Sequence, residues 1–136
     1  METETIETTE DIFGPVISSY SRAQAIEDGV LVDLMQEETS ATVREAGFVF
    51  PIAMTATAFG ASICPIGGEL PAGQDLQGRL WDMLMMLKFT IQNNRGDRER
   101  LPFSVKVSGR MVGLVSVCGP GDHAEPVITI MMPDED

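Results

Sequence analysis

Residues 76–93 limit the possible folds of this chain more than any other segment does. Apolar side chains recur there every three or four residues, which is the spacing of one face of an α-helix. Asp75 stands in front of them as an N-cap, and the sequence NNRG at 93–96 favours an end to the helix. The segment therefore predicts one long helix, and Trp81 with the methionines near it widens the stripe enough to predict burial on more than one side.

The segments that follow are typical of strands. Residues 103–108 alternate apolar and polar side chains, and residues 112–117 continue on a return strand. Gly109-Arg110 between them predicts a two-residue turn of type II′ with glycine first. A loop over 119–125 and a strand over 126–132 complete the pattern. The predicted fold class is α+β, with one long central helix packed on a C-terminal antiparallel β-meander and short helices and strands before it.

The N-terminal half predicts shorter elements. These are a helix over 22–27 capped by Ser21 and ended by Gly29, a strand over 30–34, a helix capped by Thr39 or Ser40 and ended by Gly47, a strand over 48–54 with Pro51 inside it, and a helical turn over 56–62 capped by Thr55. The acidic composition of residues 1–11 predicts a flexible tail. A single globular α+β domain is expected over 12–133, with a second acidic tail over 134–136.

Charge is segregated along the chain. Residues 88–110 hold six of the nine basic groups and two acids, so the formal charge of this segment is about +4, whereas the remainder carries about −16. The net charge of −12 makes the surface repel nucleic-acid phosphate and anionic lipid and favours basic partners. The expected partner is another protein, and residues 88–110 are the one segment suited to nucleic-acid contact.

Several classes of protein are disfavoured. Cys64 and Cys118 lack the spacing of zinc ligands, and their apolar surroundings predict free buried thiols in a reducing cytoplasm. The acidic N-terminus lacks the apolar core of a secretory signal, and the long helix is too short and too polar to cross a membrane. The glycine-rich segments lack phosphate-loop spacing. A cytoplasmic protein without a cofactor is expected.

Two sets of residues bear on catalysis. Cys118 and His123 are the one Cys/His pair close in sequence, but a cysteine buried in a strand is a poor nucleophile. Five carboxylates lie near apolar elements without the D-x-D or E-x-K pattern of a metal-dependent site. We therefore predict no catalytic residue and no metal ligand. The five carboxylates are Asp28, Asp33, Asp82, Asp122 and Glu125.

Two further sets bear on binding. Trp81, Met83, Met85, Met86 and Phe89 crowd the long helix, where they predict core, or alternatively an adaptable surface for another protein. Three arginines follow that helix and predict a solvated loop, or contact with a phosphate backbone or with the acidic half of a second copy. The arginines are Arg95, Arg98 and Arg100.

Several stretches together resemble a family of small bacterial proteins of unknown function carried on plasmids and other mobile elements. They are residues 11–14 (DIFG), 20–33 (YSRAQAIEDGVLVD), 44–48 (REAGF), 50–51 (FP), 79–84 (RLWDML), 118–122 (CGPGD) and 124–136 (AEPVITIMMPDED). The resemblance implies a bacterial cytoplasmic setting and an accessory role in a mobile element. It supplies no catalytic residue, and His123 stands where the family has an acid.

The leading functional hypothesis is a non-enzymatic acidic binding protein of a mobile element. One version is an anti-defence inhibitor, against restriction or CRISPR proteins, that acts by protein contact or by mimicking DNA phosphate. The best candidate contacts are carboxylates outside the termini: Glu27, Asp28, Asp33, Glu37, Glu38 and Glu45. One alternative is a small hydrolase or nuclease accessory that uses Asp28, Asp33 or the 118–125 loop. Another is a self-associating domain that uses the Met/Trp helix face.

Overall fold

The computed structural model describes residues 20–64, 68–70, 75–94 and 99–135. The predicted tail over residues 1–11 and two of the candidate arginines, Arg95 and Arg98, lie outside the described residues. The helices and strands are, in chain order, α1 (Arg22–Glu27), β1 (Leu31–Asp33), α2 (Glu37–Glu45), β2 (Ile52–Thr55), α3 (Ala56–Ser62), α4 (Leu76–Gln92), β3 (Arg100–Val107), β4 (Arg110–Pro120) and β5 (Pro126–Met131).

Three predicted helix starts are confirmed by the hydrogen bonds that cap them. Ser21 begins α1 in a capping box with Gln24, and the Thr55 hydroxyl accepts from the backbone N–H of the third residue of α3. The Asp75 carboxylate accepts from Gly78 N at 2.6 Å at the start of α4.

The start predicted for the second helix is wrong. Gln36 precedes α2 without a side-chain cap, so the helix begins two residues before Thr39. The Thr39 hydroxyl is buried and donates to Leu34 O at 2.6 Å, which ties the first turn of α2 to the end of β1. The side chain is therefore used for a contact with the preceding turn and not for a cap.

The α+β prediction is confirmed. The five strands form one sheet in the order β1-β2-β5-β4-β3, and β3, β4 and β5 make the predicted antiparallel meander. The sequence did not predict that β2 joins this sheet in parallel with β5, where Ile52 lies opposite Ile128. Pro51 precedes β2 and does not interrupt it, so no ladder hydrogen bond is lost to the proline.

The β3–β4 turn lies one residue earlier than predicted. Val107 pairs with Arg110, so the turn residues are Ser108 and Gly109, and both have positive φ angles, of 50° and 81°. Positive φ at both positions is the requirement of a type I′ turn, in place of the predicted type II′. Arg100 and Leu101 belong to β3 and not to the predicted charged loop.

The free edge of β3 carries a proline that restricts strand addition. Cys118 N donates to Glu99 O at 2.9 Å, and ladder bonds recur at alternate residues, so Pro102 falls where the backbone faces away from β4. A proline at that position costs no bond within the sheet. It also removes one N–H from the edge that another strand would use.

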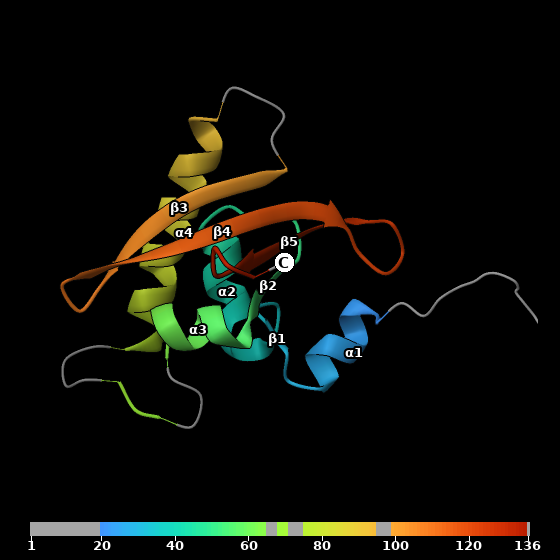
Figure 1. Ribbon diagram of the computed structural model, residues 1–136, viewed down its shortest axis with the longest axis horizontal. Coiled ribbons are helices and arrows are strands. Elements are labelled where there is room, and N and C mark those ends of the chain that lie inside the picture. Colours follow the sequence, from blue (N-terminus) through green and yellow to red (C-terminus); the bar gives the residue numbers. More distant parts are fainter. Residues whose placement is uncertain (1–19, 65–67, 71–74, 95–98, 136) are drawn as a thin grey trace, which may run out of the picture.

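The core lies between one face of the sheet and the helices α2, α3 and α4. Figure 1 shows α4 running beside β3 and α1 standing apart from the other three helices, near β1. The long helix therefore packs near the β3 edge and shares its face of the sheet with two other helices, so it is only partly the central helix that was predicted. Side chains from the helices α2, α3 and α4 and from the strands β2, β3, β4 and β5 fill this core, among them Leu34, Val43, Ile52, Met54, Leu80, Met83, Leu84, Leu87, Leu114 and Ile130.

Candidate functional site

The candidate acidic residues on α2 are exposed and rigidly placed. Glu37 and Glu38 occupy the first turn of α2, where negative charge stabilises a helix, and Glu45 is its last residue. Gln77 on α4 donates to Glu38 O at 2.7 Å, and α2 packs along α4 through Val43 and its neighbours. These three carboxylates therefore project from a helix that is fixed against the core.

The candidate acidic residues near α1 are partly engaged within the chain. Asp28 accepts from the Tyr20 hydroxyl at 2.6 Å, an interaction that raises the pKa of Tyr20. Asp33 ends β1, and its carboxylate accepts from Met35 N at 2.9 Å. Glu27 is exposed on α1. The candidate carboxylates thus form two sets, one near α1 and β1 and one on α2. Among the described residues, only the set on α2 has no carboxylate that accepts a hydrogen bond from within the chain.

Arg22 and Asp122 join α1 to the face of the sheet that α2, α3 and α4 leave uncovered. The Arg22 guanidinium donates to Thr129 Oγ1 at 2.7 Å and to Ile128 O at 3.0 Å. The Asp122 carboxylate accepts from Arg22 N at 2.8 Å and from Ala23 N at 3.0 Å. We call this set of contacts the Arg22–Asp122 latch. It connects residues about one hundred positions apart in sequence.

The latch is expected to make folding depend on pH. Backbone hydrogen bonds from Arg22 and Ala23 hold the pKa of Asp122 below its usual value. A lowered folded-state pKa contributes stability above the unfolded pKa, about 3.9, and this contribution is lost as pH falls through the folded-state value. Thermal unfolding of wild type and Asp122→Asn should therefore differ by a constant amount above about pH 5 and converge below pH 4. A difference that is unchanged down to pH 3 would show that Asp122 does not act through its charge.

The carboxylates of the hydrolase alternative do not meet in the cavity that Asp122 lines, although the charges of Asp33, Asp122 and Glu125 all act on Arg22. A cavity of about 490 Å³ lies between α1 and strands β4 and β5, and Asp122 lines it, whereas Asp28, Asp33 and His123 do not. No group of three or more His, Cys, Asp or Glu side chains in the described ranges is placed to hold a metal ion. Catalysis by Asp28, Asp33 or the 118–125 loop stays a prediction without a supporting geometry.

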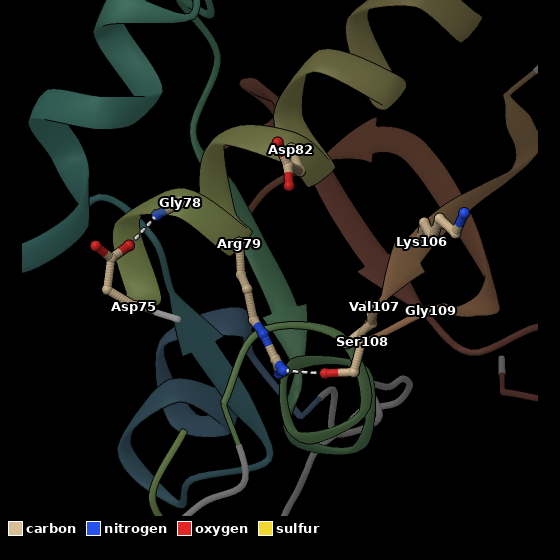
Figure 2. A pocket seen from close by; sticks show the side chains of 8 residues that line it. All are labelled: Asp75, Gly78, Arg79, Asp82, Lys106, Val107, Ser108 and Gly109. Carbon is tan, nitrogen blue, oxygen red and sulfur yellow. Dashed lines mark hydrogen bonds between the residues drawn. The ribbon is translucent and has the colours of Figure 1, made fainter. Parts of the chain in front are cut away.

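A second cavity, of about 460 Å³, lies between the start of α4 and the β3–β4 turn. Figure 2 shows Arg79 reaching across it to Ser108, where its Nη2 donates to Oγ at 2.8 Å. Arg79 Nη1 also donates to Ile63 O at 3.3 Å, so this cation is held by loop and turn. Asp75, Asp82 and Lys106 line the same cavity, and its mixture of charges selects neither anions nor cations.

Sequence reasoning missed an apolar surface that follows α2. The run FVF at 48–50 was predicted to belong to a strand, but it precedes β2, and Val49 is 84% exposed and Phe50 is 42% exposed. These residues border a cleft of about 350 Å³ that Lys88, Ile91 and Cys118 also line. The predicted burial of Cys118 is therefore wrong, because its thiol is exposed at this cleft.

The Met/Trp face of α4 divides in two. Met83 is completely buried, whereas Trp81 and Met86 are each 39% exposed and Phe89 is 61% exposed. The prediction that these side chains widen a buried stripe is therefore wrong for the outer face, which has no described element packed over it. Self-association through this outer face stays a prediction.

Comparison with known proteins places this chain in a family. The model of DUF6573, described as a family of unknown function, matches residues 10–136. The chain belongs to DUF6573. No curated protein and no solved structure matches it.

The DUF6573 match covers every described helix and strand from α1 to β5. The acidic face of α2, the latch and the cleft beside Phe50 therefore all lie within the family region. No described helix is long and apolar enough to span a membrane.

Arg100, the one candidate arginine of the described part, donates from Nη2 to Pro133 O at 3.1 Å and so contacts the C-terminal segment.

Proposed function

We propose that this protein is a non-enzymatic binding protein that contacts the basic surface of another protein through α2 and the loop after it. The observation that carries the proposal is the juxtaposition of three exposed carboxylates on α2 with exposed Val49 and Phe50 directly after it. A protein interface combines apolar anchors with charged groups around them. Glu45 supports this proposal, because a negative charge at the end of a helix weakens that helix and so has no structural benefit there.

A finer proposal concerns the partner. The resemblance to proteins of plasmids and other mobile elements favours a bacterial setting, in which the partner is a DNA-binding or defence protein of the host. Such a protein has a basic surface that recognises phosphate, and the spaced carboxylates of α2 would occupy it. Binding would then inhibit the partner without any chemical reaction.

A charge-reversed variant tests the proposed contact. The triple variant Glu37→Lys, Glu38→Lys, Glu45→Lys should bind the partner at least about tenfold more weakly than wild type, because attraction becomes repulsion. The partner is first identified by affinity capture from a bacterial lysate and mass spectrometry, and binding is then measured with the purified partner at two salt concentrations. Higher salt should weaken wild-type binding.

A second triple variant is the matched control. Glu69→Lys, Asp82→Lys, Asp134→Lys also replaces three exposed carboxylates by three ammonium groups, so both variants change the formal net charge from −12 to −6. The control should retain binding, because its sites lie away from α2. Equal losses in the two variants would show that net charge alone attracts the partner, and an unchanged α2 variant would overturn the proposal.

A further inference from the structure

The cleft beside Phe50 has the size and lining of a small-molecule site. It lies between the loop after α2, the last turns of α4 and the inner face of strands β3, β4 and β5, and its volume is about 350 Å³. Ligand pockets are of this size or larger and are mostly apolar with a few placed polar groups. The apolar lining consists of Phe48, Val49, Phe50, Ile91, Leu101 and Ile128.

Ser116 places a buried hydroxyl at this cleft without a partner in the described part of the chain. Its residue is 3% exposed on β4, where it lies opposite Leu101 and Ile130. None of the hydrogen bonds among the described residues involves its side chain. A buried hydroxyl without a hydrogen bond is unfavourable, and alanine or valine would avoid that cost in this apolar setting. Ser116 therefore points to a polar atom that enters the cleft from outside.

Lys88 places a cation at the same cleft. Its Nζ donates to Ala46 O at 3.0 Å, which leaves other N–H donors of the ammonium group, and it forms no ion pair with a carboxylate of the described residues. Gly47 has a φ of 96°, and a Cβ there would lie 3.1 Å from Lys88 Nζ, so the glycine permits this close approach. The backbone after α2 thus holds a half-buried ammonium group beside apolar walls.

We infer that this cleft binds a small apolar monocarboxylate. Its carboxylate pairs with Lys88, its hydrocarbon body lies among Phe48, Phe50 and Ile128, and a second polar atom forms a hydrogen bond with Ser116. Glu99 also lines the cleft, so a ligand with one negative charge fits better than a ligand with two. This inference does not depend on the proposed protein contact, because it concerns the isolated chain.

The test uses three probes that differ by one group. Octanoate, 1-octanol and 8-hydroxyoctanoate are added to the full chain carrying Cys64→Ser, in which Cys118 at the cleft is the remaining thiol. Alkylation of Cys118 by iodoacetamide should slow as the cleft fills. Octanoate should protect at a concentration at least about tenfold lower than 1-octanol, because Lys88 attracts its carboxylate. Absence of protection by octanoate would overturn the inference.

Variants assign the two polar contacts. Lys88→Met should remove the preference for octanoate over 1-octanol, Lys88→Arg should retain it, and Lys106→Met is the control at the other lysine of the chain. Ser116→Ala should weaken 8-hydroxyoctanoate about threefold or more and leave octanoate unchanged. Glu99→Gln should strengthen octanoate binding. If octanoate and 1-octanol protect wild type equally, or if Lys106→Met acts like Lys88→Met, the assignment of the carboxylate to Lys88 is wrong.

Discussion

Replacing Met83 by alanine is expected to lower the free energy of unfolding by about 2–5 kcal/mol. Met83 is completely buried on α4 and belongs to the core between the helices and the sheet. Removing its side chain beyond Cβ loses apolar burial and leaves a cavity that the packed neighbours fill only in part. Urea unfolding at pH 7, followed by circular dichroism, measures the change.

Met86→Ala is the matched control, because it makes the same chemical change on the same helix. Met86 is 39% exposed, so its replacement should lower the free energy of unfolding by less than about 1 kcal/mol. Comparable losses for the two variants would mean that the outer face of α4 is covered, for example by a second copy of the chain. The dependence of the Met86→Ala result on protein concentration would then identify that contact.

The two methionines also show what periodicity predicts and what it does not. The spacing of Leu80, Met83, Leu84 and Leu87 predicted the buried face of α4 correctly, because a helix repeats every 3.6 residues whatever surrounds it. Periodicity did not reveal that Met86 and Phe89 lie outside the core. An apolar residue type shows a tendency to be buried, but burial needs a neighbouring element, and a local pattern does not contain that information.

Helix starts were predictable where the capping side chain lies within three residues of its partner. This holds for Ser21, Thr55 and Asp75, whose hydrogen bonds are all local. The parallel pairing of β2 with β5 joins segments more than seventy residues apart, and the sequence of neither segment indicates that the other is its partner strand. The turn at Ser108-Gly109 differs from the prediction by one residue, because serine at positive φ is uncommon and the sequence gives little reason to expect it.

The candidate sites also divide into features that local sequence predicts and features that depend on distant segments. The sequence placed Glu45 on a short helix, where a charged side chain is commonly exposed, but it left Glu37 and Glu38 before the predicted start of that helix. The cleft was not predictable, because it forms where the helical layer ends before the strands do. Cys118 and Ser116 stand at alternate positions of β4 that face the helices, but no described helix covers Cys118. Alternation predicts the face on which a strand residue lies, not whether a second layer reaches it.

Arg22→Met is expected to lower the free energy of unfolding by about 2–3 kcal/mol. The guanidinium donates to Thr129 Oγ1 and Ile128 O, and hydrogen bonds from a charged donor are stronger than neutral ones. Methionine keeps much of the aliphatic length but supplies no donor. The variant also removes a cation that attracts the carboxylates of Asp33, Asp122 and Glu125. Urea unfolding, followed by the fluorescence of the one tryptophan, measures the loss.

Two variants separate the contacts of Arg22 from its charge. Arg22→Lys keeps the cation but lacks the planar fork that reaches two acceptors at once, so it should recover only part of the loss. Arg110→Met removes an exposed arginine that makes no hydrogen bond to the described residues and should change stability by no more than about 0.5 kcal/mol. Full recovery by lysine would assign the effect to charge alone. A loss from Arg110→Met as large as that from Arg22→Met would show that the latch does not hold α1 on the sheet, because net charge would then account for both.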